Sequence, residues 1–125
     1  MLFKKPLLEK ILSGQKTQTR RSIKKKRGAR VYSVGDKMGV RAGYTKYTAY
    51  VIITKRVRQK LGNISEIDAQ KEGFSSIEEF KQIWIKLYGK WRPNTVVWVY
   101  EFKLAPAELQ DSTSISKLVQ QATSR

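Results

Sequence analysis

Residues 14–21 of the chain read Gly-Gln-Lys-Thr-Gln-Thr-Arg-Arg and gather the side chains best suited to chemistry. Thr19 offers a hydroxyl, which is a poor nucleophile unless a base lies beside it. Lys16 becomes such a base when it loses its proton, and nearby cations together with burial lower the pKa of a lysine. Arg21 is suited to hold a carbonyl oxygen or a phosphate. The segment therefore has the residue types for nucleophilic chemistry or for binding an anion.

The spacing of Lys16 and Thr19 sets a condition on the backbone. Side chains alternate between the two faces of a regular strand, so residues three apart point to opposite faces. In a turn, residues three apart are neighbours. We therefore predict an irregular backbone over residues 14–19.

The composition excludes several kinds of site. The chain has 125 residues, with no cysteine and no histidine. Disulfides, thiolate catalysis, histidine triads and sites with cysteine or histidine metal ligands are excluded, and acid–base work falls to Lys, Glu, Asp or Tyr. We expect no cofactor and no metal. No apolar stretch approaches the roughly 20 residues of a membrane helix, and no signal peptide is recognisable, so we expect a soluble cytoplasmic protein.

The charge is concentrated in the first half of the chain. Residues 1–60 contain 18 basic and 2 acidic side chains, whereas residues 61–125 contain 8 of each. Such an excess favours a polyanionic partner, and nucleic acid is the expected one, RNA before DNA. An anionic membrane surface is a weaker alternative because no basic segment is amphipathic, and a solvated face without a partner is another. The candidate nucleic-acid-binding residues are Arg20, Arg21, Lys24, Lys25, Lys26, Arg27, Arg30, Arg41, Tyr44 and Lys46.

Tyrosines 44, 47 and 50 alternate with cations in the same region. Aromatic rings beside phosphate-binding cations are typical of surfaces on which bases stack. Packing of these rings across neighbouring strands is the alternative interpretation. Glu101 is expected to pair either with a cation of residues 14–21 or in a structural ion pair elsewhere.

Hydrophobic periodicity predicts the elements that must position these residues, in the order helix, strand, strand, helix, helix, strand. Two helices are predicted to begin at capping boxes, Ser65 with Asp68 and Ser76 with Glu79. The second of them should bury Phe80, Ile83, Trp84 and Leu87 in the core. The predicted ranges are a helix over 6–13, strands over 38–42, 47–57 and 96–104, and helices over 65–73 and 76–89.

Residues 14–21, directly after the first predicted helix, match a known motif. Gly14, Lys16, Thr19 and Arg21 match every defined position of the Gly-x-Lys-x-x-Thr-x-Arg motif that marks the ASCH family. The resemblance extends over about residues 2–103. It includes Gly35-Asp36 before a strand, Gly73-Phe74 after a helix, and the final strand Val97 to Phe102.

This resemblance implies an α+β fold similar to the PUA domain, a small β-barrel with short helices packed over its ends. Residues 1–104 are expected to form the domain, and residues 105–125 an appendage that either docks as a short helix or remains flexible. PUA-like clefts bind RNA or a nucleoside. Some ASCH proteins remove the acetyl group of N4-acetylcytidine, and their catalytic residues correspond here to Lys16, Thr19 and Glu72.

Three functions follow as expectations. The first is nucleic-acid binding, with RNA most favoured and the motif cleft as the recognition site. The second is an amidohydrolase that deacetylates N4-acetylcytidine, so that a modified nucleoside would be the partner. The third is a ribonuclease, which is the weakest because the chain lacks histidine and clustered carboxylates.

Overall fold

The computed structural model describes residues 1–23, 30–43 and 47–110. Six of the residues expected to contact nucleic acid, Lys24, Lys25, Lys26, Arg27, Tyr44 and Lys46, lie outside these ranges. Their role stays a prediction.

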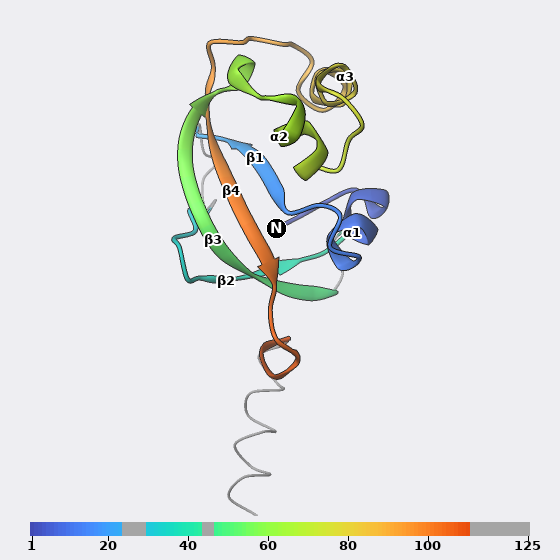
Figure 1. Cartoon of the computed structure of the whole chain (residues 1–125), viewed down its shortest axis with the longest axis vertical. Helices are drawn as coiled ribbons and strands as arrows, with labels where there is room; N and C mark the ends of the chain where they lie inside the picture. Colours follow the sequence, from blue (N-terminus) through green and yellow to red (C-terminus); the bar gives the residue numbers. More distant parts are fainter. Residues whose placement is uncertain (24–29, 44–46, 111–125) are drawn as a thin grey trace, which may run out of the picture.

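A four-stranded antiparallel sheet forms the centre of the molecule (Figure 1). Its spatial order is β1-β4-β3-β2, and in the described part of the chain β1 and β2 are its two edges. The sheet curves strongly, and the register of β3 against β4 shifts between Ile53 and Lys55. The strands are β1 (Gln18–Ser22), β2 (Lys37–Val40), β3 (Ala49–Lys60) and β4 (Val96–Leu104).

Three α-helices accompany the sheet: α1 (Lys5–Leu12), α2 (Glu66–Lys71) and α3 (Ile77–Tyr88). Helix α2 begins at the predicted capping box, because Ser65 Oγ accepts from the Asp68 N–H while the Asp68 carboxylate accepts from the Ser65 N–H. At α3 only half of the predicted box forms, since Ser76 Oγ accepts from the Glu79 N–H without the reciprocal bond. Short 3-10 turns follow β3 and β4, at η1 (Leu61–Asn63) and η2 (Ala107–Leu109). No helix in the described residues is long and apolar enough to cross a membrane.

Strand β4 contributes to two hydrophobic clusters, one on each face of the sheet, because its side chains alternate. Val97 and Val99 face a cluster that contains Phe80 and Trp84 of α3. Tyr100 and Phe102 face the other cluster, which also contains Phe3, Met38, Val40 and Ile53. The two clusters hold β4 in place from both faces of the sheet. Strand β1, which pairs with β4, is positioned by it.

The α+β fold class is confirmed, and β4 has the bounds that the sequence predicts. Helix α1 starts and ends one residue before the predicted range. In the expected appendage, Gln110 holds residues 105–110 to the start of β3: its Oε1 accepts from the Tyr50 N–H, and its Nε2 donates to the Ala105 carbonyl. Residues 111–125 lie outside the described ranges.

Candidate functional site

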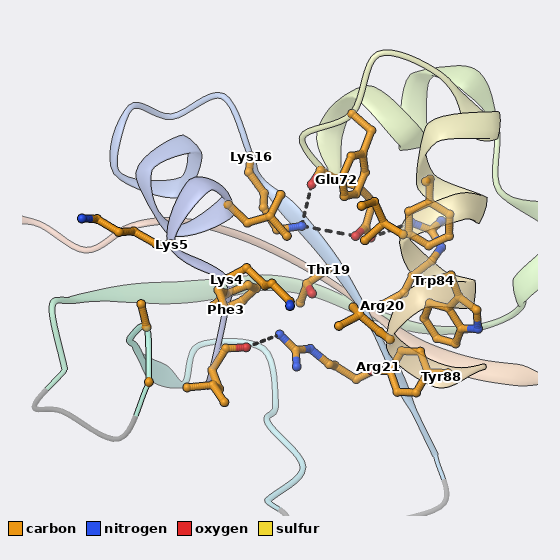
Figure 2. Close-up of a pocket in the computed structure, with 18 residues that line it drawn as sticks. Phe3, Lys4, Lys5, Lys16, Thr19, Arg20, Arg21, Glu72, Trp84 and Tyr88 are labelled. Atoms are coloured by element: carbon orange, nitrogen blue, oxygen red, sulfur yellow. Dashed lines mark hydrogen bonds and ion pairs between the residues drawn. The ribbon is translucent and has the colours of Figure 1, made fainter. Parts of the chain in front are cut away.

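A pocket of about 730 Å³ opens between α1, the start of β1 and α3 (Figure 2). Its polar part contains all three residues that the family resemblance singles out, Lys16, Thr19 and Glu72. Volumes of 300–1,000 Å³ are usual for pockets that bind small molecules. The other lining residues are Leu2, Phe3, Lys4, Lys5, Leu7, Arg20, Arg21, Ala42, Gly43, Phe74, Phe80, Ile83, Trp84, Leu87 and Tyr88.

The backbone between α1 and β1 is irregular over residues 14–17, but the predicted range of 14–19 is too long because Gln18 and Thr19 already belong to β1. Gly14 has a φ of 81°, in the left-handed region that glycine adopts without strain. The Lys16 N–H donates to the carbonyl of Lys10, and the Thr17 N–H donates to that of Lys71, so this stretch is held by α1 and α2. Regular strand begins only at residue 18, and the turn before it brings Lys16 to the pocket that Thr19 also lines.

The Lys16 ammonium is buried and has three acceptors. Its Nζ lies 2.7 Å from the carbonyl oxygens of Gln18 and Glu72 and 3.2 Å from Glu72 Oε1. Burial lowers the pKa of Lys16, the Glu72 carboxylate opposes that effect, and the charges of Arg21 and Arg20 add to it. The expected lowering of this pKa is therefore present, but burial contributes more to it than the neighbouring cations.

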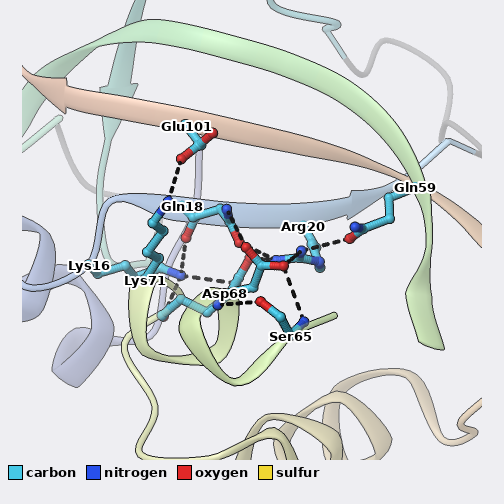
Figure 3. Close-up of polar contacts among 9 residues, drawn as sticks. Lys16, Gln18, Arg20, Gln59, Ser65, Asp68, Lys71 and Glu101 are labelled. Atoms are coloured by element: carbon cyan, nitrogen blue, oxygen red, sulfur yellow. Dashed lines mark hydrogen bonds and ion pairs between the residues drawn. The ribbon is translucent and has the colours of Figure 1, made fainter. Parts of the chain in front are cut away.

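Glu72 joins Lys16 to a second buried cation. Its Oε2 accepts a hydrogen bond of 2.9 Å from Arg20, whose guanidinium also lies 3.3 Å from Asp68 Oδ2 and 2.7 Å from Gln59 Oε1. A further bond runs from Arg20 to the side-chain oxygen of Gln18. Figure 3 shows this network between β1, β3 and α2. Arg20, expected among the nucleic-acid-binding residues, is thus buried in an internal ion network.

Arg21 lies on the opposite face of β1 from Arg20 and lines the pocket. Its guanidinium donates to the Leu2 carbonyl at 2.9 Å and lies 4.7 Å from the centre of the Phe3 ring (Figure 2). Within the described residues no carboxylate pairs with it. Partial burial lowers the pKa of Arg21 from its ordinary value. Arg21 is therefore a cation that faces the pocket with no ion-pair partner among the described residues, although the Glu72 carboxylate lines the same pocket.

The Thr19 side chain is buried, yet it lines the same pocket. Among the described residues its hydroxyl has no hydrogen-bond partner, and in Figure 2 it lies between Lys16 and Arg21. A hydroxyl without an internal partner is available to a ligand. No hydrogen bond joins it to Lys16 in the described part of the chain.

Helix α3 forms an aromatic wall of the pocket. The rings of Trp84 and Tyr88 have centroids 4.3 Å apart. Phe80 and Trp84 are buried as predicted, but the placement of Ile83 and Leu87 in the core is wrong. Ile83 is half-buried and Leu87 is 49% exposed, because this end of the apolar face lines the open pocket. Helical periodicity gives the direction of an apolar face but not whether a protein layer covers it.

No family model matches the sequence, and no curated protein matches it. Solved structures do match its fold. An ASCH domain from Lactobacillus crispatus superposes with a TM-score of 0.69 at 18% identity, covering 79% of this chain and 70% of that one. An ASCH mutant protein from Zymomonas mobilis superposes with a TM-score of 0.60 at 10% identity, covering 97% and 93%.

The chain has the fold of an ASCH domain. An Enterococcus faecalis protein that carries a domain of unknown function has a similar fold, with a TM-score of 0.61, 22% identity, and coverage of 80% of this chain and 70% of that one. At these identities the likeness establishes the fold, while the site rests on this chain's own residues.

The remaining candidate residues of this ASCH-fold domain lie away from the pocket floor. Arg30 Nη2 lies 3.6 Å from Asp36 Oδ2, and the guanidinium carbon of Arg30 lies 4.7 Å from the centre of the Tyr32 ring. Arg41 lies 5.2 Å from the centre of the Tyr47 ring.

The ring of Tyr47 is 5.6 Å from that of Tyr50, so these two tyrosines do pack on each other. The Glu101 carboxylate forms ion pairs with Lys71 Nζ at 3.2 Å and Lys55 Nζ at 3.7 Å. Of the two expectations for Glu101, the structure therefore has the ion pair outside residues 14–21. No group of three or more acidic side chains that could hold a metal ion occurs among the described residues.

Sequence reasoning missed Lys4 and Lys5, which line the pocket rim at the start of α1. Both are exposed, and neither has an acidic partner in the described part of the chain. Their signal was present in the sequence as two lysines before Pro6, but only the placement of α1 beside β1 brings them to the pocket.

Proposed function

We propose that the pocket binds one nucleotide of a single-stranded nucleic acid, with RNA favoured over DNA. The observation that carries this proposal is Arg21, a guanidinium in a pocket without a carboxylate partner among the described residues. Arginine binds phosphate oxygens in a bidentate geometry, so a phosphate is a suitable counter-charge. The exposed Lys4 and Lys5 at the rim add to the attraction of a polyanion.

The rest of the pocket suits a base. Trp84, Leu87 and Tyr88 provide an apolar and aromatic wall on which a base can stack. Thr19 offers a hydroxyl that can donate to or accept from a base edge or a ribose hydroxyl. The similarity of the ASCH fold to the PUA domain, which the sequence resemblance implies, is the reason to favour RNA.

The experiment measures the affinity of fluorescein-labelled single-stranded RNA by anisotropy at several salt concentrations, for the wild type and Arg21→Met. We expect the substitution to weaken binding by about tenfold, since one charged contact contributes roughly 1–3 kcal/mol. Lys103→Met is the matched control, because Lys103 is exposed on β4 outside the pocket and its loss changes the net charge equally. Equal losses in the two variants, or binding insensitive to salt, would contradict the proposal.

A second candidate function is hydrolysis of the acetyl amide of N4-acetylcytidine. One observation favours it: the buried Lys16–Glu72 pair, 3.2 Å apart, and the unpartnered Thr19 hydroxyl line one pocket. Thr19 Oγ would attack the acetyl carbonyl carbon, and its proton would pass through neutral Lys16 to the departing N4 of cytidine as the C–N bond breaks. Water then releases acetate from Thr19, and Arg21 stabilises the oxyanion.

In this second function Lys16 must act as a neutral amine. Its ammonium group would therefore have to lose one proton, although three oxygen atoms now accept hydrogen bonds from it. The lowered pKa of Lys16 favours that step, and the absence of a Lys16–Thr19 hydrogen bond within the described residues opposes it. For this reason binding is our first proposal.

Acetate release from N4-acetylcytidine tests the hydrolysis, with Thr19→Val, Lys16→Met and the conservative Thr19→Ser compared with the wild type. A hydrolase of this design loses at least a hundredfold in rate in the first two variants, the usual scale for removing a nucleophile or base, and retains activity in Thr19→Ser. No acetate release by the wild type, or release that survives both Thr19→Val and Lys16→Met, removes this candidate.

A further inference from the structure

The face of the sheet that adjoins the pocket presents a row of cations around one tryptophan. On β4, Trp98 is the direct partner of Arg21 on β1 and of Arg58 on β3. Side chains at directly paired positions lie on the same face, so the three form one row across three strands. Arg56, two residues before Arg58, lies on that face as well. We call Arg21, Arg56, Arg58 and Trp98 the Trp98 strip.

The strip is held together by contacts between guanidinium groups and the indole. The guanidinium carbons of Arg56 and Arg58 lie 4.6 Å and 4.8 Å from the centre of the Trp98 ring. Arg56 also donates to the Tyr32 carbonyl at 3.0 Å, which fixes it further. The Trp98 side chain also packs against the hydrophobic cluster that contains Phe102 and Ile53. The contacts with Trp98 and Tyr32 order Arg56 before any ligand arrives, which lowers the entropy cost of binding there.

In the described part of the chain, no carboxylate lies within ion-pair distance of the strip. Among the described residues, Arg21, Arg56 and Arg58 have no ion pair. Lys55, on the same strand but on the opposite face, pairs with Glu101, and Arg20 pairs with Glu72 and Asp68. The sheet therefore places the paired Lys55 and Arg20 on one face and the unpaired Arg21, Arg56 and Arg58 on the other. Three close cations without acids repel one another, and an external polyanion relieves that repulsion.

We propose that the Trp98 strip binds the nucleotides next to the one held in the pocket, so that a single RNA strand runs from the pocket across β4 to β3. This inference rests on the proposed function and extends it, because Arg21 belongs to both the pocket and the strip. Two strand spacings separate Arg21 from Arg58, roughly 10 Å along the row. Phosphates bind the guanidinium groups, while bases stack on the planes of the arginines and the indole.

A second observation points to a ligand on the strip. The Trp98 Nε1–H is buried and has no hydrogen-bond partner in the described part of the chain. An unpaired donor under the exposed Arg58 costs free energy that an acceptor oxygen can recover if Arg58 turns toward a phosphate. A single strand suits this row better than a duplex because its bases are free to stack on side chains.

The test uses a length series: uridine 5′-monophosphate, then single-stranded oligouridines of two to eight nucleotides, titrated against the wild type, Arg58→Met, Arg21→Met and the control Lys103→Met. Arg58 is exposed, so its substitution leaves the core intact, and equal melting temperatures verify this. We expect Arg58→Met to weaken the octamer by roughly tenfold and to lower its salt slope by about 1, without changing the affinity of the monophosphate. Arg21→Met should weaken both ligands.

The outcomes separate the two proposals. If Arg58→Met weakens the octamer no more than Lys103→Met does, the strip is wrong, and pocket binding stands if Arg21→Met weakens the monophosphate. If neither the monophosphate nor any oligomer binds, the proposed function itself fails. If an eight-base-pair RNA duplex binds more tightly than the octamer and depends equally on Arg58, the single-strand path is overturned.

Discussion

Arg20 and Arg21 are adjacent in the sequence, and the structure gives them opposite surroundings. Arg20 is buried and contacts two carboxylates and two amide oxygens. Arg21 reaches a backbone carbonyl and an aromatic ring, and its face is open to the pocket. The difference follows from the alternation of side chains along a strand, which sends neighbours to opposite faces.

The comparison separates the two tasks that a positive charge has in this molecule. A buried cation must be paired, because an uncompensated charge away from water costs several kcal/mol. Lys16 and Arg20 meet that requirement through Glu72. Arg21 and the other arginines of the Trp98 strip have no such partner in the described residues and remain available for an anion from outside. Substitutions of the paired cations should therefore lower the free energy of unfolding, whereas substitutions of the unpaired arginines should weaken the binding of an anionic ligand.

The largest effect is expected from Glu72→Gln, on the paired side. The change removes the negative charge that lies between Lys16 and Arg20, and it leaves two buried cations with weaker partners. Breaking a buried ion pair by removing one member costs about 3–5 kcal/mol of the free energy of unfolding. Urea denaturation followed by circular dichroism measures this loss.

Glu9→Gln is the control for Glu72→Gln, because Glu9 is exposed on α1 and has no ion pair among the described residues. It should change the free energy of unfolding by less than about 0.5 kcal/mol. Similar values for the two variants would show that the network around Glu72 is not what holds α2 to β1.

Arg20→Met and Arg21→Met compare the two faces directly with the same chemical change. Arg20→Met leaves Glu72 with a single cation and should lose about 3 kcal/mol of stability. Arg21→Met loses only a hydrogen bond and a contact with Phe3, about 1 kcal/mol, but it should weaken RNA binding about tenfold. For both variants, urea denaturation measures the free energy of unfolding and fluorescence anisotropy measures the affinity for RNA. A loss of stability for Arg21→Met as large as that for Arg20→Met contradicts the division of tasks.

The pH dependence of stability tests which influence dominates at Lys16. Burial lowers the folded-state pKa of Lys16 despite Glu72, so between that pKa and the unfolded value near 10.5 the unfolded state binds more protons. Stability must then rise with pH in that window, by at most about 1.4 kcal/mol per pH unit. The measurement is the free energy of unfolding of the wild type minus that of Lys16→Met, from pH 7 to 10.5. A difference that falls over this range means that the Glu72 charge outweighs burial.

Much of this arrangement could be predicted from the sequence because the signals are local. Ser65 and Asp68 are three residues apart and form the predicted capping box, and the apolar run of residues 96–104 is β4. The motif residues and Glu72 were linked by resemblance to the ASCH family, and the structure brings Lys16 and Glu72 into contact. Local spacing also required the turn before β1.

The division between Arg20 and Arg21 could not be predicted, because it depends on non-local facts. The residue at which β1 begins and the pairing of β1 with β4 decide which of the two arginines points toward α2. Likewise, Trp98 and Arg58 are 40 positions apart, and the shift of register near Ile53 decides which residues of β3 lie opposite β4. The exposure of Leu87 follows from an open pocket, which no periodicity encodes.

The smallest effect is expected at the outer end of the network, from Asp68→Asn. Burial raises the pKa of Asp68, but hydrogen bonds from Ser65 and Gln18 and the charge of Arg20 together hold it below its ordinary value. A depressed folded-state pKa contributes stability that is present above the unfolded value and is lost as the pH falls through the folded one. At pH 7 we expect Asp68→Asn to cost about 1 kcal/mol, because asparagine keeps the capping geometry and loses the charge.

The difference between wild type and Asp68→Asn should therefore shrink toward zero when urea denaturation is repeated from pH 5 down to pH 2.5. Once protonated, Asp68 has no more charge than asparagine, and both offer one oxygen to the Ser65 N–H. A constant difference across this range would mean that Arg20 gains nothing from the Asp68 charge. In that case Glu72 alone would neutralise the buried side of β1, and the contrast with Arg21 would depend on a single carboxylate.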